Sequence, residues 1–145
     1  MPASSASGAR ALTLDPETKD EESVEENERI IREFIEAWSR LDPVELAGYF
    51  TDDGVYHNMP MGPVAGRANV ENLIRGFIAA WTETTWDLRN ILCAGDVVIA
   101  ERLDRTRAGD KAADLPCVGV FEMEGGRIKV WRDYFDFATY QRGMA

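Results

Sequence analysis

The sequence has little of what metal, nucleotide and covalent-catalysis sites require. Its 145 residues include two cysteines, Cys93 and Cys117, and one histidine, His57. With no CxxC pair and no His/Cys cluster, a metal site is not predicted, and both thiols are expected to be free and buried. No GxGxxG, Walker or GxSxG sequence is present, so nucleotide binding and a Ser-His-Asp triad are not expected either. We therefore expect no metal and no cofactor.

Basic charge and long hydrophobic runs are also scarce. The net charge is −10, and residues 1–28 carry eight acidic side chains against two basic ones. Because an acidic surface repels phosphate groups, neither nucleic acid nor a membrane surface is an expected partner. No apolar run approaches the roughly 20 residues of a membrane-spanning helix. Since no signal peptide fits the first residues either, we expect a cytoplasmic protein.

The remaining composition predicts one globular domain and a tail. The chain is 45% hydrophobic and contains four tryptophans, enough for a single core. Residues 1–22 are rich in Ala, Ser, Gly and acidic residues and have no hydrophobic periodicity, which predicts a disordered acidic tail. We expect this domain to span residues 23–145.

The first half of this domain has the signals of helices. Ser23 begins a capping-box sequence that ends at Glu26, and apolar residues then recur on one face as far as Trp38. Asp42 and Pro43 are an N-cap and a first helical residue. The predicted elements are a helix over 23–41, a short helix over 43–50, a turn at 53–54, a strand over 55–59, a loop over 59–67 and a helix over 70–81.

From Thr84 onward the pattern changes to period two. Turn signals at 94–96, 109–110 and 125–126 divide it into four strands, which should form an antiparallel meander. The predicted strands are 84–93, 96–107, 111–124 and 127–137. Helices followed by a sheet predict an α+β fold, with the helices packed on one face of the sheet.

Strand alternation groups three charged side chains. Arg102 and Asp104 share one face of their strand, and Asp133 shares a face with Trp131 and Phe135. If Trp131 faces the core, Asp133 faces it too and needs a partner, for which Arg102 is the candidate. Spacing alone leaves two alternatives, an ordinary buried ion-pair network or exposed charges on a strand with its faces reversed.

Such a group of side chains would provide an acid and a base in one pocket. Two carboxylates that share one arginine in a dry cavity are not both ionised, so one keeps its proton. This suits the addition of water to a strained electrophile. Tyr56 and Asn58 alternate to one side of their strand and could hold the water, whereas His57 points the other way and is expected at a surface or interface.

At these residues the sequence resembles the limonene-1,2-epoxide hydrolase family of the NTF2-like fold group. The resemblance extends over about residues 27–140. Its most specific segments are YHNMP (56–60), ERLD (101–104), GVF (119–121) and WRDYFD (131–136).

The resemblance implies a fold, an activity and five roles. The fold is a cone, in which a curved mixed β-sheet with helices on one face encloses an apolar pocket, and it usually forms a homodimer. The activity is one-step hydrolysis of a small lipophilic epoxide, terpene-like or cyclic, to a vicinal diol without a covalent intermediate. Asp133 would be the general base, and Tyr56 and Asn58 would hold the water. Asp104 would be the general acid, and Arg102 would bridge the two aspartates.

A lipophilic substrate requires an apolar pocket. For each candidate lining residue, plain core packing is the alternative. The candidates are Trp38, Leu73, Phe77, Trp81, Leu115, Phe135 and Tyr140. Two other functions stay open on the same fold, a ketosteroid-isomerase-like or polyketide-cyclase-like (SnoaL-like) enzyme and a non-catalytic domain that binds a small ligand.

Overall fold

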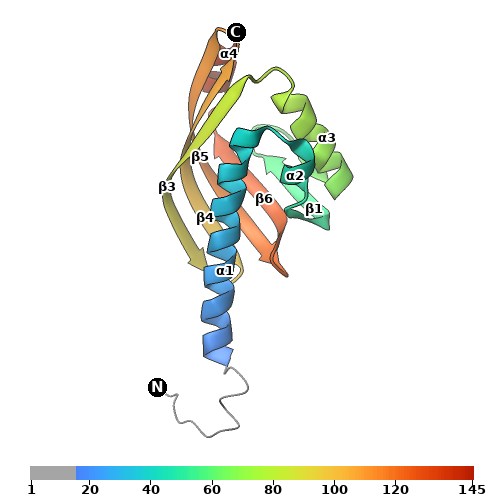
Figure 1. Cartoon of the computed structure of the whole chain (residues 1–145), viewed down its shortest axis with the longest axis vertical. Helices are drawn as coiled ribbons and strands as arrows, with labels where there is room; N and C mark the ends of the chain where they lie inside the picture. Colours follow the sequence, from blue (N-terminus) through green and yellow to red (C-terminus); the bar gives the residue numbers. More distant parts are fainter. Residues whose placement is uncertain (1–15) are drawn as a thin grey trace, which may run out of the picture.

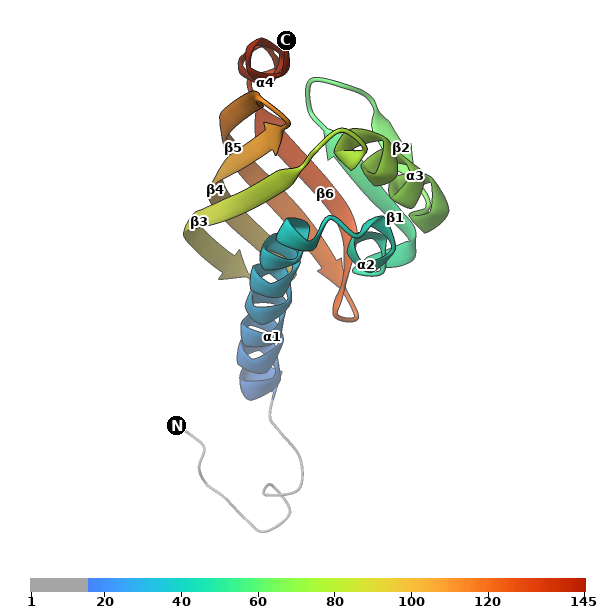
Figure 2. The same cartoon turned by 45° about the horizontal axis from the view of Figure 1, so that its top comes forward.

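Residues 16–145 are described by the structure, a computed structural model, with side chains from Asp20 onward. The elements in chain order are α1 (Pro16–Ala37), the 3₁₀ turn η2 (Trp38–Arg40), α2 (Pro43–Ala47), β1 (Phe50–Asn58), β2 (Pro63–Ala65), α3 (Arg67–Ile78), β3 (Glu83–Ala94), β4 (Val97–Ala108), β5 (Lys111–Glu124), β6 (Arg127–Phe135) and α4 (Phe137–Met144). One curved sheet in the order β2-β1-β6-β5-β4-β3 forms the body of the fold (Figure 1). The helices α1, α2 and α3 lie on one side of this sheet, and α4 lies at one end of it (Figure 2).

The apolar stripe of α1 packs against the sheet. Ile31, Phe34, Ile35 and Trp38 recur at helical spacing and are almost fully buried, as the sequence predicts. The predicted helix start at Ser23 is wrong, because α1 already includes Pro16. Residues 16–22 are therefore helical. Residues 1–15 of the expected tail lie outside the described residues.

The start of α2 follows the capping rule. The Asp42 carboxylate accepts hydrogen bonds from the backbone N–H groups of Val44 and Glu45, at 3.0 and 3.2 Å. The predicted cap is confirmed, although the helix ends at Ala47, before Phe50.

Three predictions about where elements begin and end are wrong. β1 runs through residues 53–54 without a turn, and its register with β6 shifts there instead. The expected loop contains the short edge strand β2, which pairs with β1. The last strand stops at Phe135, because Asp136 caps α4 by accepting from the N–H of Thr139 at 3.3 Å. Large apolar residues still alternate at Phe135 and Phe137, so the sequence pattern predicted a continued strand at this helix start.

The four predicted strands of the meander are confirmed as β3 to β6, with ends that differ by one or two residues. β1 adds to β6 in parallel, so the sheet is mixed and the fold is α+β. Across the described part of the chain, no helix has both the length and the apolar character needed to cross a bilayer.

Candidate active site

Register places the polar residues of the site on neighbouring strands. Asn58 on β1 lies beside Asp133 on β6, and Asp133 lies opposite Gly119 on β5. Arg102 on β4 lies opposite Cys117 on β5. Since alternate residues of a strand point to the same face, these side chains all point to the face covered by the helices.

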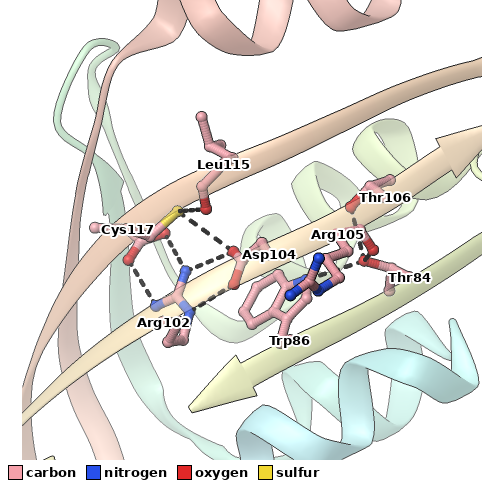
Figure 3. A network of polar contacts seen from close by, with 9 residues as sticks. Thr84, Trp86, Arg102, Asp104, Arg105, Thr106, Leu115 and Cys117 are labelled. Carbon is pink, nitrogen blue, oxygen red and sulfur yellow. Dashed lines mark hydrogen bonds and ion pairs between the residues drawn. The ribbon is translucent and has the colours of Figure 1, made fainter. Parts of the chain in front are cut away.

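Arg102 binds both aspartates with the three nitrogens of its guanidinium group. Figure 3 shows its contacts with Asp104. Its Nε and Nη2 donate to Oδ1 and Oδ2 of Asp104 at 3.0 and 2.8 Å. Its Nη1 and Nη2 donate to Oδ1 and Oδ2 of Asp133 at 2.9 and 3.0 Å. The exposed fractions are 1% for Arg102, 6% for Asp104 and 3% for Asp133. The alternative of exposed charges is therefore wrong, and the trio lies inside the protein.

An aromatic ring supports the guanidinium from β3. The Arg102 Cζ atom lies 4.4 Å from the ring centroid of Trp86 and 5.7 Å from that of Trp131. Cation–π contacts of this kind partly replace the hydration that a buried guanidinium loses. Trp86 was not a predicted site residue. The sequence signal for Trp86 is the alternation along β3. In the pairing of β3 with β4, Trp86 lies opposite Asp104.

The charge balance of the trio favours one bound proton. Two carboxylates and one guanidinium carry a net negative charge, which burial penalises, whereas one added proton makes the group neutral. Burial raises the pKa of Asp133 above its ordinary value, and this effect outweighs the opposing charge and hydrogen bonds of Arg102. The carboxyl group of Asp133 is thus tuned toward accepting a proton.

Tyr56 and Asn58 lie beside this carboxyl group. Both are buried, and the Tyr56 ring stacks on Trp131 with centroids 4.2 Å apart and planes 6° apart. Burial and the nearby charge of Asp133 hold the pKa of Tyr56 well above its usual range, so the phenol stays neutral. His57 points away, and its Nε2 lies 3.0 Å from the carbonyl oxygen of Met61.

An apolar cavity of about 300 Å³ opens above the two carboxylates. Its lining includes Asp104, Asp133, Tyr56 and Asn58, together with six of the seven predicted pocket residues. Those six are Trp38, Phe77, Trp81, Leu115, Phe135 and Tyr140.

The pocket prediction has one error and several omissions. Leu73 does not line the cavity, because it packs half-buried against the core. The lining residues that sequence reasoning missed are Met61, Trp86, Thr106, Ala113, Cys117 and Phe137. Alternation could have found three of them, since Thr106 follows Asp104 on the inner face of β4, and Ala113 and Cys117 flank Leu115 on that of β5.

The Cys117 thiol lies against the carboxyl group of Asp104. Its Sγ lies 3.4 Å from Oδ2 of Asp104 and 3.5 Å from the carbonyl oxygen of Leu115. Burial, with a contribution from the charge of Asp104, raises the pKa of this thiol far above its usual range. Asp104, Cys117 and Asp133 offer ligand atoms within 4.8 Å of one another. A metal ion there would have to displace Arg102, which already donates to all four carboxylate oxygens.

Two comparisons at the level of sequence find relatives of this chain. A family profile described as the limonene-1,2-epoxide hydrolase catalytic domain matches residues 25–145. The epoxide hydrolase EphG of Mycobacterium tuberculosis is 29% identical over 114 residues, which are 79% of this chain and 76% of that protein.

Solved structures share the fold. A structure of an M. tuberculosis LEH-like epoxide hydrolase has a TM-score of 0.73 and 28% identity, and the match covers 83% of this chain and 90% of that one. An NTF2-like protein from Burkholderia pseudomallei has a TM-score of 0.74 at 23% identity, covering 83% and 98% of the two chains. The expected NTF2-like fold is confirmed.

Proposed function

The chain belongs to the limonene-1,2-epoxide hydrolase family, and we propose that it adds water to a small lipophilic epoxide, terpene-like or cyclic, to give a vicinal diol. The reaction is a single concerted step with no covalent intermediate and no cofactor. The carrying observation is one guanidinium that donates to two buried carboxylates at the wall of an apolar cavity.

Asp133 acts as the general base. The neutral Tyr56 phenol and the Asn58 amide hold a water molecule beside it. As the water oxygen forms a bond to an epoxide carbon, its proton passes to Asp133. The raised pKa of this carboxyl group brings its proton affinity closer to what the step requires.

Asp104 acts as the general acid. The carbon–oxygen bond of the epoxide breaks as its oxygen takes the proton of Asp104, so no free alkoxide forms. Arg102 binds both carboxyl groups throughout, and the total charge of the trio stays constant because one proton enters as another leaves. A proton then returns from Asp133 to Asp104, which restores the starting state. Acid and base each contribute about 10²- to 10⁴-fold to the rate.

A single-turnover reaction with limonene oxide in ¹⁸O-labelled water tests this proposal. Label in the diol on the first turnover is expected if water attacks the epoxide directly. Label that enters the diol only on later turnovers would indicate an ester on a carboxylate and contradict the one-step mechanism. Isomerisation of an enone without any diol from epoxides would favour the ketosteroid-isomerase-like alternative.

We further propose a cytoplasmic homodimer that needs no partner besides substrate and water. Large apolar side chains are exposed on the outer face of the sheet, opposite the helices, which supports a subunit interface there. This outer-face patch consists of Leu92, Ile99, Val118 and Tyr134. The free thiols of Cys93 and Cys117 support a reducing compartment.

A further inference from the structure

Aromatic side chains form much of the cavity wall. They come from η2, α3, α4, β1, β3, β6 and the connection between α3 and β3. The aromatic lining residues are Trp38, Tyr56, Phe77, Trp81, Trp86, Phe135, Phe137 and Tyr140. An aliphatic lining would bury an apolar substrate equally well, so this composition points to a more specific ligand.

Four of these rings form two stacked pairs that meet at an angle. Trp38 and Trp86 have centroids 4.2 Å apart and planes 12° apart. Phe77 and Trp81 have centroids 6.5 Å apart and planes 11° apart. Trp38 and Trp81 join the pairs, with centroids 6.3 Å apart and planes 45° apart. The rings of the wall thus have more than one orientation.

Two polar contacts fix this wall relative to the trio. Trp81 Nε1 donates to the Tyr140 hydroxyl at 3.0 Å, which links the end of α3 to α4. Trp86 Nε1 donates to Thr84 Oγ1 at 3.1 Å while its ring lies under Arg102. The aromatic wall therefore begins at the guanidinium and continues to the helix α4.

We propose, on the basis of the function proposed above, that the substrate class is epoxides that carry one flat aromatic ring next to the oxirane. The ring lies against the wall of Trp38, Trp81 and Trp86 while the oxirane reaches Asp104 and Asp133. Stacked and edge-to-face contacts add roughly 2- to 10-fold to binding beyond the apolar area that is buried. A cavity of about 300 Å³ is at the small end of ligand pockets, which suits one ring.

A matched pair of substrates tests this proposal. 2-Benzyloxirane and 2-(cyclohexylmethyl)oxirane have the same oxirane and the same methylene spacer, so the ring is not conjugated with the reacting carbon. The cyclohexyl compound is the more hydrophobic one. We expect kcat/KM to be about 2- to 10-fold higher for the benzyl compound, mainly through a lower KM.

Trp81→Leu should reduce this ratio to about one, because the benzyl compound loses its aromatic contact with the wall. Tyr134→Leu, on the outer face of the sheet and away from the cavity, is the matched control and should keep the ratio. If Trp81→Leu fails to fold, inhibition of the native protein by 3-phenylpropane-1,2-diol and by its cyclohexyl analogue gives the same comparison.

The outcomes separate this inference from the proposed function. Diol from both compounds with a ratio of one or less would overturn the aromatic preference and leave the hydrolase intact. If none of the three epoxides (the benzyl compound, the cyclohexylmethyl compound and limonene oxide) gave a diol, both the aromatic preference and the proposed function would be overturned. Weaker inhibition by the phenyl diol than by the cyclohexyl diol would also overturn the preference.

Discussion

At the scale of single residues, Arg102 has to reach across a strand. It starts from β4 and binds Asp133 on β6, so its side chain passes over β5. The β5 residue opposite Asp133 is Gly119. A Cβ atom on Gly119 would lie 2.8 Å from Trp131 Nε1 and 3.0 Å from Arg102 Nη1. The absence of a side chain is what leaves room for the guanidinium.

Gly119→Ala should therefore separate Arg102 from Asp133. Both neighbours of the new methyl group are buried and hold fixed positions, so we expect kcat to fall on the order of a hundredfold, as small misplacements in active sites do. Overpacking should destabilise the protein by about 1–3 kcal/mol. Diol formation and urea unfolding measure the two effects. Gly76→Ala in α3, where a Cβ meets nothing within 4 Å, is the control and should leave kcat unchanged.

Asp104→Asn and Asp133→Asn should each remove one proton transfer. The amide has nearly the shape of the acid, so we expect kcat to fall about 10²- to 10⁴-fold with the far-ultraviolet circular dichroism unchanged. Asp110→Asn in the exposed turn between β4 and β5 should retain full activity. Diol formation by Asp133→Asn near the native rate would remove Asp133 from the mechanism.

The raised pKa of Asp133 predicts the acid side of the pH profile. The base must be ionised, so kcat/KM should fall as pH drops through a value above the 3.8 of an ordinary aspartate.

Because the folded-state pKa of Asp133 exceeds the unfolded one, protonation of Asp133 favours the folded state. This stabilisation is present below pH 3.8 and is lost as pH rises through the raised pKa. Urea unfolding of Asp133→Asn should lack this part of the pH dependence of stability. If kcat/KM fell only at or below pH 3.8, Asp133 would not be the general base.

At the scale of elements, α4 closes one side of the cavity. Phe137 and Tyr140 line the cavity, and Gly143 lets the helix approach β5 closely. A Cβ on Gly143 would lie 2.5 Å from the Ala112 carbonyl oxygen and 2.7 Å from the Ala113 Cβ. The sequence did not predict α4, although one expected pocket residue, Tyr140, lies on it and a second, Trp81, donates a hydrogen bond to Tyr140.

Gly143→Ala should displace α4 from β5 without reaching the trio. We expect KM for a lipophilic epoxide to rise several-fold, because apolar contacts worth about 25 cal/mol per Å² are lost from the wall. The kcat at saturating substrate should change much less. Steady-state kinetics of Gly143→Ala, compared with those of the control Gly76→Ala, distinguish this effect from a general loss of stability. A fall in kcat as large as that of Gly119→Ala, at unchanged KM, would show that α4 acts on the chemistry.

At the scale of the whole molecule, the sheet separates two surfaces. Its inner face carries the cavity, and its outer face carries the exposed patch of Leu92, Ile99, Val118 and Tyr134. Val118 pairs with Glu101 on β4 and Tyr134 on β6, which places it in the middle of the sheet. A dimer formed through this face would leave the cavity accessible.

Val118→Glu should convert the proposed dimer into a monomer. Burying an unpaired carboxylate in a symmetric interface is strongly unfavourable, and the symmetry places two of them there. Sedimentation equilibrium should give twice the chain mass for the native protein and the chain mass for the variant. Val44→Glu, at an exposed position of α2, should remain a dimer. A native protein that sediments as a monomer would contradict the proposed interface.

The sequence by itself determined the α+β class, the meander and the shared strand face of Arg102 and Asp104. These follow from local rules, since alternation assigns faces within a strand and turn residues mark where strands end. Alternation also placed Tyr56 and Asn58 on the same face of their strand. The missed elements, β2 and α4, are short and lack a strong periodic signal.

Only the tertiary structure decided which strands became neighbours and what each side chain met there. The parallel pairing of β1 with β6 brings Asn58 beside Asp133, although the two residues are far apart in the chain. The exclusion of Leu73 from the cavity and the inclusion of Trp86 depend on how α3 and β3 pack over the sheet. Contacts between distant segments depend on the packing of the whole chain, so no local pattern specifies them.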